Sequence, residues 1–188
     1  MIALIALLTA LYLINDRLLR INVFLGWTAP SPAFSFSIVA VIIAGYVLGW
    51  RGGLLVALLG QLVGPAFWPI GGPIWLELTL SWAILGAIVG FVVYRRRNRT
   101  TLSLAINLAV ALVFATIFMT FVNTAIAMFR FSFEGDWYWT QIGLRLWRFI
   151  VTHAIVFIIC LPLIRGIARP IERFILIDTD TDGGEDDA

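Results

Sequence analysis

Long apolar runs make up most of the chain, and short polar or glycine- and proline-rich stretches separate them. Read as helices, the runs have the approximate bounds 2–14, 36–50, 54–63, 75–94, 102–128 and 139–164. Such runs predict membrane helices, because each crossing takes about 20 mostly apolar residues. The second and third runs are short, so we expect neighbouring helices to shield them. A re-entrant third segment is the alternative, with one span fewer.

The composition indicates that lipid is the solvent for these runs. Of the 188 residues, 61% are hydrophobic and 13% are charged, whereas about a quarter of a soluble domain is charged. A water-soluble fold of this size exposes too much surface to hide so many apolar side chains. We therefore predict an all-α integral membrane protein of the cell membrane, a compact bundle of about six transmembrane helices.

The distribution of charge predicts how the bundle lies in the membrane. All 13 basic residues are arginines, and six spans place eight of them on one side and five on the other. Because arginine accumulates on the cytoplasmic side, both termini are predicted to be cytoplasmic. The acidic segment 173–188 has no apolar face. We expect it to be a disordered cytoplasmic tail that follows a membrane domain of residues 1–172.

Polar residues follow single faces of four predicted helices, in the half of the bundle that is predicted to face outward. By helix they are Thr9, Tyr12, Asp16 and Arg20; Glu77 and Ser81; Thr116, Thr120 and Asn123; and Gln141, Arg145, Arg148 and Thr152. Charged groups at membrane depth usually face the bundle interior or a wet cavity. An arginine-rich pocket suits an anionic small molecule, since a guanidinium holds a carboxylate through two hydrogen bonds. Alternatively, these arginines reach the membrane interface or pair with nearby carboxylates.

The sequence contains no recognisable set of residues for catalysis or for metal binding. Cys160 and His153 are each the single residue of their type, and both lie in apolar runs. An internal disulfide is therefore ruled out, and we expect no metal site. We interpret His153 as a packed or bundle-facing side chain rather than a proton relay. We expect no enzymatic activity, no cofactor and no nucleic-acid partner, and any energy from ATP must come from partner proteins.

Small residues four positions apart occur on two of the predicted helices. Ala6 and Ala10 share a face of the first helix, and Gly86 and Gly90 share a face of the fourth. This spacing lets two helices approach closely in lipid. We expect the glycine pair to serve a contact within the bundle, and the alanine pair to admit another helix.

Six segments carry a further signal in their order and spacing. They are Ala44 to Gly53, Ala57 to Gly64, Trp68 to Pro73, Leu78 to Ser81, Asn123-Thr124, and Arg145 to Arg148. Together they resemble the substrate-binding S components of energy-coupling factor (ECF) vitamin transporters, most closely the folate-type branch. The resemblance covers about residues 3–166. Gln61 departs from it where folate-type members often carry an acid, and Glu77 departs at a glycine-like position; both departures bear on the substrate rather than on the family.

The resemblance implies a six-helix S component that captures a water-soluble vitamin from outside at high affinity. Folate is the first expectation, and pantothenate or a similar vitamin is the second. Release inside would follow docking onto a transmembrane coupling subunit that works with two ATPase subunits. The Ala6 and Ala10 pair resembles the motif through which the family meets that coupling subunit.

These arguments predict a set of substrate-binding residues. Four arginines are expected to hold a carboxylate, and a tryptophan is expected to stack on a ring. The set is Arg17, Arg20, Arg145, Arg148, Trp68, Trp75 (or Trp137), Glu77 and Asn123. The runner-up from another class is a structural membrane protein of the cell envelope, like the small rod-shape determinants, and an apolar interior without a ligand would favour it.

Overall fold

The computed structural model describes residues 2–18, 21–22, 33–67, 76–94, 100–131 and 135–181. Its elements are α1 (Ile2–Leu13), a π-helical turn η1 (Ile14–Leu18), strands β1 (Ile21–Asn22) and β2 (Ala33–Phe34), and helices α2 (Ile38–Leu48), α3 (Trp50–Phe67), α4 (Leu76–Val93), α5 (Thr101–Phe131) and α6 (Gly135–Thr181). The predicted helical membrane bundle is confirmed. The strands pair antiparallel, with Ile21 opposite Phe34, a small feature that the hydrophobic pattern does not predict.

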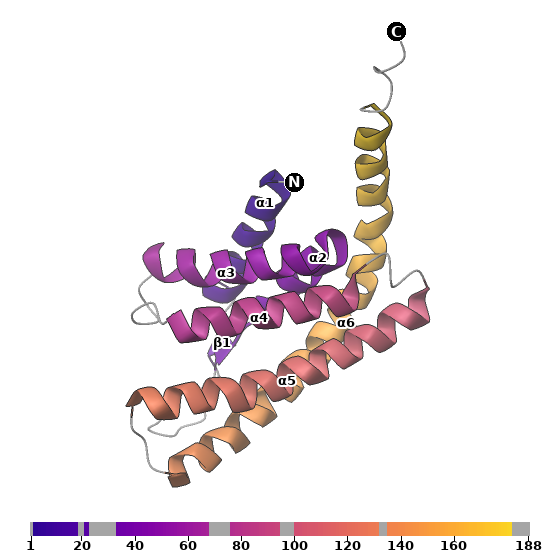
Figure 1. Cartoon of the computed structure of the whole chain (residues 1–188). Helices are drawn as coiled ribbons and strands as arrows, with labels where there is room; N and C mark the ends of the chain where they lie inside the picture. The colour runs from indigo at the N-terminus through magenta and orange to yellow at the C-terminus, as the bar shows by residue number, and fades with distance from the viewer. Residues whose placement is uncertain are drawn as a thin grey trace.

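Helix α4 lies at the centre of the packing. It contacts α2 and α3 on one side and α5 on the other, while α6 packs on α5 and α1 packs on α2 and α3. The beginnings of α4 and α6 and the end of α5 lie at the same end of the bundle (Figure 1). This is the end that the arginine distribution predicts to be outside, and the orientation itself stays a prediction.

Glycines bring α4 into close contact with α2 and α3. A Cβ atom on Gly45 would collide with the backbone of Gly90, and one on Gly53 would collide with the carbonyl group of Gly86. Backbones approach this closely only where both partners lack side chains, which is how helices pack well in lipid. The expectation that Gly86 and Gly90 serve contacts within the bundle is confirmed.

The boundary between the second and third helices differs from the prediction. We expected Arg51-Gly52-Gly53 to separate the two helices, but α3 begins at Trp50 and runs to Phe67. Gly49 alone makes the break, with a φ of 73° that favours glycine. The glycines that resemble a loop in the sequence instead form the first turn of α3, where Gly53 admits α4.

The sixth helix is longer than predicted. Its apolar run ends near Ile164, whereas α6 continues to Thr181. The apolar run marks the part of the helix that suits lipid, and the backbone helix extends beyond it into the segment that we predicted to be disordered. The division of the chain at residue 172 stays a prediction, and residues 182–188 lie outside the described part.

Polarity is distributed as membrane burial requires. Leu76, Leu80 and Ile84 follow the exposed face of α4, while Ser81 and Asn123 are buried inside the bundle. Three of the described helical stretches, Leu76–Val93, Thr101–Arg130 and Gly135–Ile167, are long and apolar enough to cross a membrane. Apolar side chains outside and polar ones inside are the arrangement expected when lipid surrounds the protein.

Candidate ligand-binding cavity

A cavity of about 320 Å³ lies inside the bundle. Side chains from six of its elements line it, including Asp16 (η1), Ile38 (α2), Gln61 (α3), Trp82 (α4), Asn123 (α5), and Arg145 and Arg148 (α6). The described lining thus contributes two guanidinium groups and one carboxylate. Ligand pockets usually have volumes of roughly 300–1,000 Å³, so this cavity suits one small molecule.

The arginine face of α6 is the most strongly charged wall of the cavity. Arg145, Arg148 and Thr152 all line it, so three of the four residues in the predicted polar line along this helix face the cavity, whereas Gln141 is not among the lining residues. The Arg148 guanidinium lies 4.6 Å from the centroid of the Phe149 ring, and the Thr152 hydroxyl donates to the Arg148 carbonyl at 2.8 Å. Arg145 is partly buried, and no carboxylate among the described residues pairs with it.

A hydrogen bond fixes the corner between α1 and α2. The Ser35 hydroxyl donates to Asp16 Oδ1 at 2.8 Å, and the Ser37 backbone N–H donates to Ser35 Oγ at 3.3 Å. The Asp16 carboxylate of η1 is therefore held against the residues just before α2, with Asp16, Ser35 and Ser37 all at the cavity wall.

Tyr12, Gln61 and Trp82 join three helices at another wall. Gln61 Nε2 donates to the Tyr12 hydroxyl at 2.6 Å, and Tyr12 is fully buried with its ring against Gly60. The Tyr12 and Trp82 rings meet edge to face, with centroids 6.3 Å apart. Because these contacts hold Trp82 in place, its indole is a pre-positioned aromatic surface for a ligand.

Asn123 is held by hydrogen bonds to two neighbours. The Ser81 hydroxyl donates to Asn123 Oδ1 at 2.6 Å, and Asn123 Nδ2 lies 3.0 Å from the Met119 sulfur. The amide is therefore oriented by α4 and by its own helix before any ligand enters.

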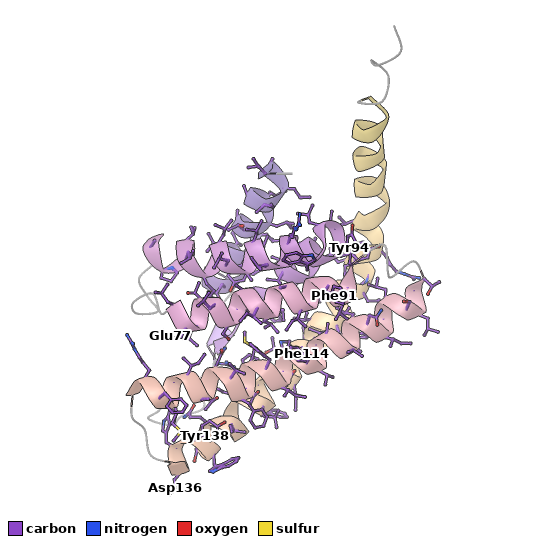
Figure 2. All side chains as sticks on the ribbon, in the orientation of Figure 1. Glu77, Phe91, Tyr94, Phe114, Asp136 and Tyr138 are labelled. Atoms are coloured by element: carbon purple, nitrogen blue, oxygen red, sulfur yellow. The ribbon has the colours of Figure 1, made fainter. Side chains whose placement is uncertain are left out.

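The structure brings together three of the predicted binding residues: Asn123, Arg145 and Arg148 all line the cavity. Glu77 does not. Its side chain is 52% exposed and lies 3.6 Å from Arg130, so that the two form an ion pair. Figure 2 shows Glu77 toward the end of the bundle that carries Asp136 and Tyr138, away from Tyr94 at the other end of α4.

The face of α4 that meets the cavity is displaced by one residue from the predicted one. Leu78 and Trp82 line the cavity, in place of Glu77. A signal for this phase is present in the sequence, since Leu78, Trp82, Gly86 and Gly90 form one line at four-residue spacing. Because Gly86 and Gly90 pack inside the bundle, the other residues on their line, including Trp82, are expected to face inward as well.

The other predicted binding residues cannot be placed against the cavity. Arg20, Trp68 and Trp75 lie outside the described residues, as does the side chain of Arg17. Trp137 is described, on the first turn of α6, and is not among the residues that line the cavity.

Phe149 and His153 are cavity residues that the sequence did not assign to the site, and Gln61 was expected near it only through the family resemblance. Gln61 is the only polar side chain between positions 54 and 66, which is a usable signal for an inward-facing residue. His153 sits one turn beyond Phe149 and stacks on its ring, with centroids 5.7 Å apart. His153 is buried and lines the cavity, which agrees with the expectation of a packed or bundle-facing side chain.

The predicted partner-binding residues lie on the outer face of α1. Ala6 and Ala10 are both exposed, together with Ala3, Leu7 and Ile14 on the same stripe. The opposite face of α1 is buried in the bundle through Ile5, Leu8 and Tyr12. The alanine pair is therefore accessible to another helix in the membrane.

The family model for the substrate-specific component of ECF transporters matches residues 1–167. The chain belongs to this family. It is thus an S component, a transporter subunit that works with the transmembrane and ATPase subunits of an ECF system, which favours this class over a structural envelope protein. The family model does not specify the substrate, and no curated protein matches the sequence.

Proposed function

We propose that this S component captures an anionic water-soluble vitamin, with folate as the first candidate, in the cavity lined by η1 and helices α2 to α6. The vitamin enters from the outer side, and the partner subunits complete its uptake with energy from two ATPases. The observation that supports this most directly is Arg145, a partly buried cation at membrane depth without a carboxylate partner among the described residues.

The cost of burying a cation explains why a ligand is expected at this position. An ion that leaves water inside a protein loses several kcal/mol unless an opposite charge and hydrogen bonds replace its hydration. Arg145 faces the cavity, so the carboxylate of a captured molecule can supply that replacement. A guanidinium also binds a carboxylate through two parallel hydrogen bonds, which orients the bound molecule.

The remaining walls favour a ligand with a ring. Trp82 presents an indole to the cavity and is held by Tyr12. Folate combines an aromatic ring system with carboxylates, and so meets both the indole and the arginines. Pantothenate has a carboxylate but no ring, and it is the second candidate.

A structural role in the cell envelope would suit an apolar interior. The interior here contains a cavity with charged, amide and hydroxyl groups, from Arg145 to Ser37. Polar groups at membrane depth are costly and are usually retained for a function. The polar cavity therefore supports ligand capture over a purely structural role.

The exposed face of α1 supports docking onto the coupling subunit. Ala6 and Ala10 keep the outer surface of α1 narrow, and small residues at this spacing let a partner helix approach closely. We propose that this stripe is the contact with the transmembrane coupling subunit.

The test is to identify the ligand directly. Small molecules released from the detergent-purified protein are analysed by mass spectrometry, and the emptied protein is then titrated calorimetrically with folate, pantothenate and other vitamins. A retained vitamin, or tight binding of one of the panel, supports the proposal and names the substrate. Absence of a retained molecule together with absence of binding across the panel would refute it.

A further inference from the structure

His153 lies where the cavity meets the interface between α5 and α6. It is 6% exposed, and it lines both the polar cavity and an apolar groove between these two helices. It is also the single histidine of the chain. The site described above assigns it no part in ligand binding.

The hydrogen bonds around Thr116 determine which ring nitrogen carries the proton. The Thr116 hydroxyl donates to the Leu112 carbonyl at 2.9 Å, a common contact for threonine inside a helix. Thr116 Oγ1 also lies 2.7 Å from His153 Nδ1. A hydroxyl has one hydrogen, so both contacts are made only if Nδ1 carries a proton and donates it to Thr116.

The other ring nitrogen, Nε2, is then an acceptor with a lone pair when the ring is neutral. Within the described part of the chain, the ring contacts Thr116 through Nδ1 and the backbone of Leu112, whose carbonyl also accepts from Thr116. Thr116 occupies Nδ1 and lines the apolar groove, and His153 itself lines the polar cavity, so Nε2 is the ring nitrogen left for a ligand there.

Resting on the proposed function, we infer that His153 Nε2 binds the captured ligand as a hydrogen-bond acceptor. The ligand must then present an N–H or O–H group at this position, in addition to an anionic group at Arg145. Thr116 acts as a positioning residue, because its contact with Nδ1 fixes the tautomer and the ring orientation.

The spacing along α6 indicates the shape of such a ligand. Arg145 and His153 are eight positions apart, which corresponds to about 12 Å along a helix axis. Arg145 is nearer to the end of the bundle where α6 begins. An elongated molecule meets both groups if its carboxylate lies near that end and its hydrogen-bond donor, such as an amino or ring N–H group, lies further inside.

Two substitutions test the contributions of the two ring nitrogens separately. An asparagine amide can replace Nδ1 and keep the contact with Thr116, whereas a glutamine amide reaches the position of Nε2. We expect His153→Asn to weaken binding of folate about tenfold or more, with little change in melting temperature. His153→Gln should stay within a few-fold of the wild type. Cys160→Ala, a change at a buried position on α6 outside the cavity, is the control.

The tautomer is measured independently by ¹⁵N NMR in nanodiscs, with histidine labelling and a purification tag that contains no histidine. Because the chain contains a single histidine, its ¹⁵N resonances need no sequence-specific assignment. We expect a protonated Nδ1 and an unprotonated Nε2 in the ligand-free protein, with the Nε2 resonance shifting when folate (or the vitamin found to bind) is added. A protonated Nε2 in the ligand-free protein, or an Nε2 resonance unmoved at saturation, would overturn the inference.

The outcomes distinguish this inference from the proposed function. Tight binding by the wild type that His153→Asn leaves unchanged overturns the role of His153 and leaves vitamin capture intact. Failure of the wild type to bind any vitamin of the panel overturns vitamin capture and the ligand contact together.

Discussion

Replacement of Arg145 by methionine has two opposite expected effects. Methionine keeps much of the length and apolar volume of the arginine stem but removes the charge. The ligand then loses its ion-pair partner, so affinity falls. The ligand-free protein loses a partly buried cation that no described carboxylate pairs with, so its stability rises or stays constant.

The size of each effect follows from the surroundings of Arg145. A hydrogen-bonded contact to a charged group contributes about 1.5–3 kcal/mol, and partial burial places Arg145 toward the upper part of that range. At 1.4 kcal/mol per tenfold change, a loss of about 2–3 kcal/mol weakens binding roughly 30- to 150-fold. Replacing buried charge by an apolar group stabilises by about 1 kcal/mol or more, which corresponds to roughly 2–4 °C in melting temperature for a chain of this size.

The assay pairs calorimetric titration of the retained vitamin with thermal unfolding of the ligand-free protein in detergent. Arg51→Met is the matched control, because Arg51 is exposed, lies over the Trp50 ring and does not line the cavity. Both measurements should leave the control near the wild type. A ligand-free Arg145→Met protein that melts well below the wild type would show that Arg145 holds the bundle together, and would refute the reasoning.

Three further predictions test other parts of the molecule. Gly86→Leu forces a side chain against the backbone of Gly53 and should lower the free energy of unfolding by at least 1–3 kcal/mol, roughly the cost of overpacking; an unchanged melting temperature would contradict the close packing. Ala6→Trp should prevent co-purification of the coupling subunit while vitamin affinity stays unchanged, and lost affinity would mean that α1 was misassigned. Truncation after Arg173 should leave affinity within about twofold, since the cavity lies far from it in sequence; a loss as large as that of Arg145→Met would contradict the site.

The bundle could be predicted from the sequence because lipid imposes a simple rule. Each helix needs a long apolar run, and three of the described runs meet the length of a membrane crossing. Helix boundaries could not be predicted where residues typical of loops lie inside a helix. Gly52 and Gly53 resemble a loop but lie in α3, because a Cβ atom would collide with Leu48 of α2 at Gly52 and with Gly86 of α4 at Gly53. Gly49, with its positive φ, makes the break instead.

The site could be predicted only as far as single helices reveal it. Arg145, Arg148 and Thr152 repeat at helical spacing, which predicts that they share one face of the helix, and all three line the cavity. The phase of α4 depended on how the glycines pack against neighbouring helices, so Glu77 was chosen and Trp82 was missed. Contacts between helices far apart in sequence, such as Tyr12 with Gln61, leave no local pattern to read.

Accounting for each polar atom separates residues that hold the bundle from residues that meet a ligand. Both polar atoms of the Asn123 amide already have contacts, with Ser81 and with the Met119 sulfur. His153 contacts Thr116 through Nδ1 and the Leu112 backbone, both on α5, and Arg145 has no carboxylate partner among the described residues. Residue type alone would rank these three side chains together as polar groups in a membrane. Their partners across the bundle rank Arg145 first for ligand binding, His153 second and Asn123 last, and that order should appear in the affinities of their substitutions.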